Sequence, residues 1–338
     1  MKILAIETSC DETAAAVVEN GRNILSNVVF TQIDVHKEYG GVVPEIASRY
    51  HIEKISQIVH GALHESGCTM EDIDAVAATT APGLIGALLV GLNFAKALAF
   101  RHNKPFIPVH HLRGHIAANY LAHTELEPPF LALVVSGGHS HIVAADSYTD
   151  FRVIGKTRDD AAGEAFDKGA RVLGLPYPGG VHMDRLASSG DARAIKFPKV
   201  HFSDAPYDFS FSGVKTSIVN FVHQCNMKKE QFSAPDVAAS YMHAITDILC
   251  ENFEKAAKEF GYTRLVVAGG VSANSMLRKK LEQMAQREKY KLFLPPLSLC
   301  GDNAAMIGSQ AFYEAQKGHV GSLSQNAKPS MAIDLNFM

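Results

Sequence analysis

Two stretches of the sequence decide the fold, KILAIETSCDE at residues 2–12 and FLALVVSGGHS at residues 130–140. Each begins as a short apolar strand and runs into a turn that is rich in polar residues or glycine. In each half of the chain two further strand-like segments follow, and then a helix, a strand and a second helix. The sequence therefore repeats one architecture with little repetition of letters.

In the first half, the pattern of apolar residues predicts strands at 3–6, 14–18, 24–30, 75–79 and 106–109, and helices at 46–65 and 84–100. A further helix, which begins near residue 111, follows the last of these strands. Asn20 and Gly21 mark a hairpin turn between the second and third strands. In the helix at 46–65 we expect one buried side, formed by Ile52, Ile55, Ile58, Val59 and Leu63.

In the second half, strands are predicted at 130–135, 141–145, 151–156, 265–268 and 291–294, and helices at 163–173, 235–260, 274–287 and 303–316. An irregular insertion is expected from 175 to about 213. The predicted class is α/β, a two-lobed fold of the actin, Hsp70 and sugar-kinase (ASKHA) type with duplicated mixed sheets and a nucleotide cleft between the lobes. We place the lobes at 1–125 and 126–338, with the last helix free to pack back on the first lobe. A generic doubly wound fold with a strand-rich edge is the alternative.

Composition and charge argue against several classes of protein. The 338 residues are 47% hydrophobic and carry a formal net charge of -3, so no global basic field draws the chain to a polyanion. Five scattered cysteines without a Cys-x-x-Cys motif argue against a disulfide framework or a zinc ribbon. The N-terminus turns acidic too early for a signal peptide, and Asn93 and Lys96 interrupt the apolar stretch at 81–100. A cytoplasmic protein is expected.

His111 and His115 are candidate metal ligands, because a spacing of four places both imidazoles on one face of a helix. The spacing alone is weak evidence, since 16 histidines give about one such pair by chance and His60 with His64 is a second. Asp302, just before the last helix, is the candidate third ligand or, alternatively, only the cap of that helix. Two imidazoles and one carboxylate leave positions open for an exogenous ligand, as in catalytic sites.

Two turns have the composition of phosphate-binding loops. After the strand that ends at Val134 and Val135 come Ser136, Gly137 and Gly138, where the backbone can turn its N–H groups toward an anion. A plain hairpin is the alternative. The second turn, at 267–274, opens a helix.

In that second turn, Asn274 is suited either to a ribose or base edge or to capping the helix. A third turn, at 7–12, places Asp11 and Glu12 where a carboxylate would face nucleotide phosphates or their metal; a solvated acidic turn is the alternative. Neither a dinucleotide-binding glycine motif nor a Walker motif is present.

Taken together these motifs resemble those of the bacterial TsaD family, whose members were once described as O-sialoglycoprotein endopeptidases. The resemblance covers essentially the whole chain and rests on IETSCDE at 6–12, EIASR at 45–49, HHLRGH at 110–115, SGGH at 136–139, GGV at 269–271 with Asn274, and GDN at 301–303. It implies transfer of the threonylcarbamoyl group from threonylcarbamoyl-AMP to N6 of adenosine 37, giving t6A, in tRNAs that read codons starting with A.

The resemblance also implies roles for particular residues. His111, His115 and Asp302 match the metal ligands of the family, usually for Fe(2+) and sometimes for Zn(2+). The positions that match substrate contacts are Val134, Val135, Ser136, Gly137, Gly138, Asp167, Gly180 and Asn274, with Asp184 less secure. Asp167 would hold the ribose hydroxyls, and Gly180 would leave room for a flat ligand. Asp11 or Glu12 is expected to accept the N6 proton.

The implied partners are tRNA, a TsaB-type homologue and a TsaE-type ATPase. For tRNA the candidate cations are Arg158, Lys168, Arg171, Arg193, Lys196 and Lys199, unless they form only a solvated face. For the TsaB-type partner the candidate surface is the helix within 81–100, whose small residues Gly83, Gly86, Ala87 and Gly91 permit close approach, unless that helix is buried in its own lobe.

Arg113 departs from the acidic residue of many relatives and is expected to add positive charge near a bound phosphate. The competing functions are an ATPase or phosphotransferase of the same fold and a non-catalytic scaffold. A metalloprotease is the least favoured, because no Glu follows His111.

Overall fold

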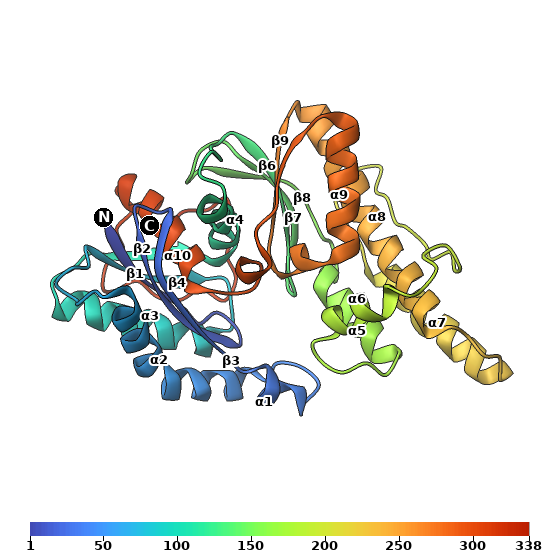
Figure 1. Ribbon diagram of the computed structural model, residues 1–338, viewed down its shortest axis with the longest axis horizontal. Helices are drawn as coiled ribbons and strands as arrows, with labels where there is room; N and C mark the ends of the chain where they lie inside the picture. The colour runs from blue at the N-terminus through green and yellow to red at the C-terminus, as the bar shows by residue number, and fades with distance from the viewer. Residues whose placement is uncertain (338) are drawn as a thin grey trace. The chain divides into compact units, whose positions relative to one another are not determined.

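The computed structural model describes residues 1–337 and divides them into two compact units (Figure 1). Unit 1 comprises Met1–Pro129, Ala145–Arg152 and the chain from Pro295 onward; unit 2 comprises Phe130–Ala144 and Val153–Leu294. The predicted α/β class with duplicated mixed sheets is confirmed. The units are not continuous in sequence, and the division of the lobes at residue 125 stays a prediction.

The sheet of unit 1 has the order β3-β2-β1-β4-β5. Its hairpin turn is formed by Asn20 and Gly21, which both have positive φ, as a two-residue turn of the primed type requires. The two hairpin pairings are antiparallel, whereas β1–β4 and β4–β5 are parallel. The strands are β1 (Lys2–Glu7), β2 (Glu12–Glu19), β3 (Asn23–Thr31), β4 (Ala75–Ala81) and β5 (Phe106–His110).

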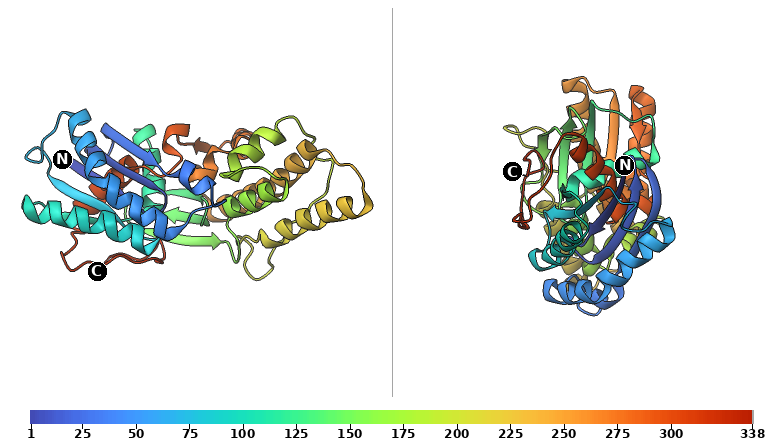
Figure 2. Two further views of the ribbon diagram at one scale, coloured as in Figure 1. Left: turned by 90° about the horizontal axis from the view of Figure 1, so that it is seen from below. Right: turned by 90° about the vertical axis from the view of Figure 1, so that its left-hand side faces the viewer.

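Helices cover both faces of this sheet because side chains alternate along its strands (Figures 1 and 2). Leu4 and Ile6 pack on one face with residues of α2 and α3, and Ile3 and Ala5 pack on the other with residues of α4 and α10. The helices are α2 (Pro44–Ser66), α3 (Ile85–Arg101), α4 (His111–Ala122) and α10 (Ala304–Gln316). A short helix that the pattern did not predict, α1 (Ile33–Lys37), follows β3.

The expected buried face of α2 is wrong at Ile52, whose side chain is 66% exposed. The buried side instead includes His51, Ile55 and Val59. His51 takes a core position because its polar atoms are satisfied there: Nε2 lies 2.8 Å from the carbonyl oxygen of Cys10, and Nδ1 lies 2.8 Å from Thr13 Oγ1. An apolar periodicity cannot anticipate a histidine that is buried through its hydrogen bonds.

The sheet of unit 2 has the order β10-β9-β6-β7-β8. Numbered within its own half, this is the order of unit 1, with the first strand in the centre, so the duplication expected from the sequence is confirmed. Parallel pairing joins β6 to β9 and β9 to β10. The strands are β6 (Phe130–Val135), β7 (Ser140–Ala145), β8 (Phe151–Lys156), β9 (Arg264–Ala268) and β10 (Lys291–Phe293).

The irregular insertion expected at 175–213 is wrong in part, because it contains a helix and leads into another. Along α7, Val214, Ile218 and Val222 recur at helical spacing and are buried. In α6 the glycines and the short length obscure the same kind of pattern. The helices of unit 2 are α5 (Ala162–Val172), α6 (Gly179–Ala187), α7 (Ser212–Lys228), α8 (Ala234–Phe260) and α9 (Ser275–Glu288).

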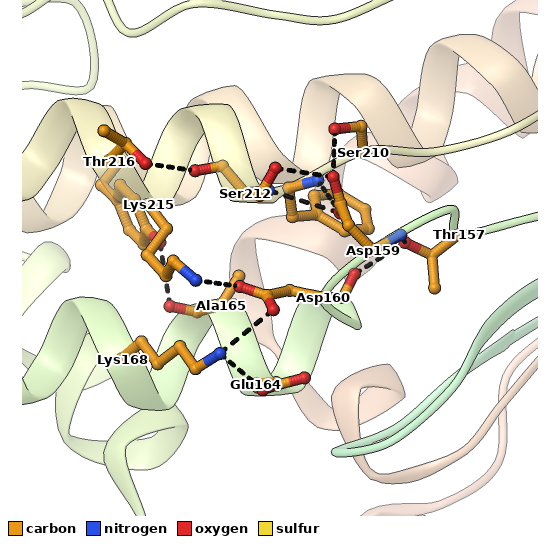
Figure 3. Close-up of polar contacts among 12 residues, drawn as sticks. Thr157, Asp159, Asp160, Glu164, Ala165, Lys168, Ser210, Ser212, Lys215 and Thr216 are labelled. Carbon is orange, nitrogen blue, oxygen red and sulfur yellow. Dashed lines mark hydrogen bonds and ion pairs between the residues drawn. The ribbon is translucent and has the colours of Figure 1, made fainter.

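Two adjacent carboxylates fasten α7 to the loop before α5 (Figure 3). Asp159 accepts hydrogen bonds from the hydroxyls of Ser210 and Ser212 at the start of α7. Asp160 forms ion pairs with Lys168 at 3.0 Å and Lys215 at 2.7 Å. Asp160 thus pairs with two of the cations of unit 2.

Among the described residues, no helix combines the length and the apolar character that crossing a membrane requires.

Candidate active site

The structure brings His111, His115 and Asp302 together in unit 1. Nε2 of His111 lies 3.5 Å from Asp302 Oδ1, and Nε2 of His115 lies 3.1 Å from the same oxygen. Ligands about 2.1 Å from a tetrahedral ion are themselves about 3.4 Å apart, so these distances suit a single cation. No other trio of His, Cys, Asp or Glu side chains in the described chain is grouped in this way.

Local structure explains how these three side chains converge. His110 caps α4 by accepting a hydrogen bond from the backbone N–H of Leu112, which places His111 in the first turn and His115 one turn later. Asn303, and not Asp302, caps α10, because its Oδ1 accepts from the N–H of Met306. The capping role weighed for Asp302 is therefore wrong.

The polar atoms of His115 also bear on the metal assignment. Its side chain is buried, and neither ring nitrogen makes a hydrogen bond in the described chain, although Nε2 lies 3.1 Å from Asp302 Oδ1. Buried polar atoms are almost always satisfied, so an imidazole in this state requires an explanation. A cation held on Nε2 beside the Asp302 carboxylate would account for that nitrogen, and the residues present therefore fit a divalent metal ion.

Glu7 is a residue of this site that sequence reasoning missed. It lies fully buried at the end of β1, and its Oε2 is 3.1 Å from Nδ1 of His111. Thr79 Oγ1, at 2.6 Å, and the backbone N–H of Ser9 donate to the same carboxylate. A carboxylate on the second nitrogen of a ligating imidazole fixes the direction of the first. An acidic residue at the end of an apolar strand was the available signal.

Charge governs the protonation of this network. Burial opposes a charge on His111, but the carboxylates of Asp302 and Glu7 outweigh it and raise the pKa of His111 to about 9. Burial likewise opposes the charge on Glu7, yet the positive charge of His111 keeps the pKa of Glu7 below its usual range. A metal ion bound at His111 must displace the imidazolium proton, so binding strengthens as the pH rises toward 9.

The two candidate proton acceptors lie in the turn after β1. Asp11 is buried, and Glu12 accepts a hydrogen bond from Thr31 Oγ1 at 3.2 Å. Burial, with the charges of Asp302 and Asp11, raises the pKa of Glu12 well above its usual value. His51 holds this turn in place through the carbonyl of Cys10. The solvated acidic turn weighed as the alternative does not fit the burial of Asp11.

In unit 2, the turn at Ser136–Gly138 presents an open backbone. Val134 and Val135 are fully buried in β6, so they position the turn through the core. A Cβ atom built on Gly137 or Gly138 would meet nothing within 4 Å. Neither glycine N–H donates to another group of the described chain, as an anion-binding turn requires.

The second glycine turn lies beside the first, because β6 and β9 are adjacent and parallel. Gly269, with φ of 91°, approaches the carbonyl of Val135 so closely that no side chain fits there. Asn274 caps α9 by accepting from the N–H of Leu277 at 2.9 Å. The capping interpretation of Asn274 is thus confirmed, while a contact with substrate stays a prediction.

The remaining candidates form a chain of contacts near these turns. Asp167 of α5 accepts a hydrogen bond from the N–H of Gly180, at 3.1 Å, and so holds the start of α6. Asp184 of α6 accepts from the N–H and hydroxyl of Ser275, next to the α9 cap. Space beside Gly180 is open, whereas a Cβ on Gly179 would lie 2.5 Å from that of Ala170. Gly179, which the sequence did not single out, is the glycine that packing requires.

Two sequence interpretations are corrected. Arg113 does not face a phosphate site, because its side chain is 1% exposed and pairs with Glu314. The small residues of α3 do not form an outer surface: Ala87 is fully buried, and Gly91 abuts Thr8 of its own unit.

The second histidine pair, His60 and His64 on the surface of α2, has no third ligand in the described chain.

The sequence matches the family model described as TsaD: tRNA N6-adenosine threonylcarbamoyltransferase over residues 23–309. Curated relatives of that name include one from Clostridium perfringens (strain 13 / Type A), 53% identical over 331 residues, and one from Clostridium beijerinckii (strain ATCC 51743 / NCIMB 8052), 52% identical over 331 residues. Each alignment covers 98% of this chain and 98% of the relative.

Solved structures show the fold. HypF of T. kodakarensis superposes with a TM-score of 0.64 at 15% identity over 94% of this chain and 48% of that one. Component A of (R)-2-hydroxyglutaryl-CoA dehydratase from Acidaminococcus fermentans gives a TM-score of 0.54 at 13% identity, covering 94% of this chain and 99% of that one. These likenesses confirm the predicted actin, Hsp70 and sugar-kinase type of fold.

Replacing Glu7 with Gln should weaken metal binding about 10- to 100-fold, because the ring of His111 loses the charge that orients it. The wild-type affinity should also rise with pH up to about 9, and the variant should show a shallower rise. Competition with a chromophoric chelator measures both quantities. Glu45→Gln, on the exposed start of α2, is the matched control and should leave affinity unchanged. Equal affinities for Glu7→Gln and the wild type would show that Glu7 does not support the ligand.

Proposed function

Because the chain belongs to the TsaD family of tRNA N6-adenosine threonylcarbamoyltransferases, we propose that it forms t6A in tRNA. It is a transferase that moves the threonylcarbamoyl group of threonylcarbamoyl-AMP to N6 of adenosine 37 in tRNAs reading codons that start with A. The observation that carries this conclusion is the grouping of His111, His115 and Asp302 in a chain with 53% identity to such enzymes along almost its whole length.

The chemistry explains why a buried ligand triad is needed. The N6 amine of adenosine is a weak nucleophile, because its lone pair is delocalised into the ring. Its attack on the carbamoyl carbon therefore requires a polarised carbonyl group and a leaving AMP whose charge is balanced. His111, His115 and Asp302 would hold a divalent cation, which would supply Lewis acidity for both needs. The set of two imidazoles and one carboxylate suits Fe(2+), our proposed ion, and also Zn(2+).

Residues of unit 2 are assigned to the adenylate. The amides of Gly137 and Gly138 would donate to its phosphate, since they are exposed and have no partner in the described chain. Ser136 flanks this turn, which Val134 and Val135 hold from the core. Asp167 is assigned to the ribose hydroxyls and Gly180 to the face of a flat ligand. Asn274 is assigned to the edge of the nucleoside, and Asp184 supports it by accepting hydrogen bonds from the adjacent Ser275.

Glu12 is our preferred acceptor of the N6 proton, ahead of Asp11. A base that works near neutral pH needs a pKa close to the working pH, and burial beside Asp302 and Asp11 raises the pKa of Glu12 in that direction. Glu12→Gln should therefore slow single-turnover transfer more than Asp11→Asn does. Equal rates for both variants and the wild type would exclude either carboxylate as the base.

His111→Ala should lower the rate of t6A formation by more than about a hundredfold, because the metal loses a ligand. The purified chain, with its TsaB- and TsaE-type partners and Fe(2+), is mixed with threonylcarbamoyl-AMP and unmodified tRNA, and mass spectrometry detects the nucleoside. His60→Ala, from the exposed histidine pair on α2, is the control and should keep the full rate. A fully active His111→Ala enzyme without metal would overturn the assignment. Phosphate release from ATP without t6A would favour the phosphotransferase alternative.

For tRNA we propose a contact at Arg193 and Lys196 in unit 2. Both side chains are exposed and form no ion pair within the described chain. They line a surface hollow of about 900 Å³ together with Lys199. Three of the other four cations expected from the sequence are less suited, because they form ion pairs: Arg158 with Asp204 and Asp208, Lys168 with Asp160 and Glu164, and Lys199 with Asp247 and Glu251.

The double reversal Arg193→Glu with Lys196→Glu should weaken tRNA binding about tenfold at moderate salt, since two phosphate contacts become repulsive. The slope of log affinity against log salt concentration should also fall by about 1.5. Filter binding across a salt series measures both. Lys279→Glu with Lys289→Glu carries the same change of charge on α9 and its C-terminal end and controls for the loss of net charge. Equal losses in the two double variants would move the tRNA site elsewhere.

We assign the TsaB-type partner to the outer side of α2 and α3. Ala87 is buried and is not available to a partner. Ile52 of α2 and Ile85 of α3 remain exposed on these neighbouring helices, with exposed fractions of 66% and 45%. Two exposed isoleucines on adjacent helices of unit 1 suit an apolar docking face. The TsaE-type ATPase stays a predicted partner without an assigned surface, and the cytoplasm stays the predicted location.

Ile52→Asp with Ile85→Asp should abolish co-elution with a TsaB-type protein in size-exclusion chromatography, because two charges would be buried in the interface. The thermal stability of the isolated chain should change little, since both side chains are exposed. Val219→Asp, at a position 43% exposed on α7, is the matched control. Co-elution that persists in the double variant would exclude this face.

A further inference from the structure

Arg113 stands between the two histidine ligands in sequence and is the largest fully buried side chain of the described chain. A guanidinium keeps its charge under all physiological conditions, so its burial is costly unless every donor is used. Two residues from each histidine on the same helix, it projects from a different side of α4. Its role is therefore distinct from that of the ligands.

The donors of Arg113 are used by two separate parts of unit 1. Nη1 donates to Glu314 Oε1 of α10 at 3.1 Å. The other contacts go to the C-terminal strap, which we define as residues 327–336: Nε donates to the carbonyl of Ile333, Nη2 to that of Leu335, and Nη1 to Asn336 Oδ1, each at 2.9 Å. The guanidinium carbon also lies 5.0 Å above the ring of Phe151.

The pair of Arg113 and Glu314 joins the two elements that carry the metal ligands. His111 and His115 belong to α4, and Asp302 lies directly before α10, of which Glu314 is in the last turn. Between these points Gly114 allows the helices to approach closely, since a Cβ there would lie 2.7 Å from Ile307 Cδ1. Two contacts, one steric and one ionic, thus fix α10 against α4.

The C-terminal strap extends this restraint along unit 1. The N–H of Lys328 donates to the carbonyl of Thr80, and the carbonyl of Pro329 accepts from the N–H of Gly83. His110, the cap of α4, lies 3.1 Å through Nε2 from the carbonyl of Met331. Without helix or strand of its own, the strap is held mainly through backbone groups, and Arg113 holds its end.

We infer that Arg113 is a positioning residue of the metal site and that the C-terminal strap is a structural part of that site. Together they hold α4 against α10 so that both imidazoles meet the Asp302 carboxylate. This inference rests on the proposed metal site. It differs from a purely structural role, which would lower stability without changing the affinity of the folded protein for metal.

The deciding experiment compares Arg113→Lys with Arg22→Lys. Arg22 is a matched control, because its guanidinium donates to the carbonyls of Tyr120 and His123 at the C-terminal end of the same helix but makes no contact with the strap. Zn(2+) affinity is measured by chelator competition at a temperature where circular dichroism shows each protein folded. We expect a loss of about tenfold or more for Arg113→Lys and a change within about twofold for Arg22→Lys.

A second variant, ending at Asn326, removes the strap and leaves Arg113 in place, and it should lose Zn(2+) affinity to a similar degree. If Arg113→Lys or the shortened chain melts at a lower temperature yet binds Zn(2+) like the wild type, the positioning role is refuted. Equal losses for Arg113→Lys and Arg22→Lys also refute it, because any weakening of α4 would then suffice. Absence of metal binding by the wild type would overturn the metal site itself, a result distinct from either of these.

Discussion

The close packing of α4 against α10 is the constraint on which the site of unit 1 depends. Gly114 is a point of close contact, because a Cβ atom there would lie 2.7 Å from Ile307 Cδ1, which would have to move. The packing brings residue 302 to the face of α4 that carries His111 and His115, although all of unit 2 separates them in sequence. A carboxylate and two imidazoles then lie close enough together for one divalent cation to contact all three.

What the sequence predicts well are properties set by neighbours along the chain. The helical spacing of His111 and His115, the glycines after β6 and the duplicated order of strands all follow from local periodicity and turn chemistry. The insertion was harder, because α6 begins with two glycines and is short. Ile52 was misplaced because the apolar pattern of α2 does not record which side meets the sheet.

Residues whose role comes from a distant partner could not be predicted. Glu7 contacts His111 only because the fold places the end of β1 beside the first turn of α4. Arg113 meets its acceptors only because the fold places α10 and the C-terminal strap beside α4. A charged residue near a metal motif suggests an exposed cation for a phosphate. Burial reverses that interpretation, since a guanidinium in the core must be satisfied by fixed acceptors.

The two units place different demands on sequence. In unit 1 the candidate chemistry lies in side chains, so the identity of a few buried groups such as His111 and Glu7 decides it. In unit 2 the candidate phosphate-binding groups are backbone amides. The path of the backbone there depends on positions that have no room for a side chain, such as Gly269. Substitutions should accordingly act differently: in unit 1 through the charge and direction of ligands, and in unit 2 through the path of the main chain. The direction of an imidazole depends on restraints on its helix, so contacts remote from the imidazoles, such as that of Arg113 with Glu314, bear on the proposed metal site.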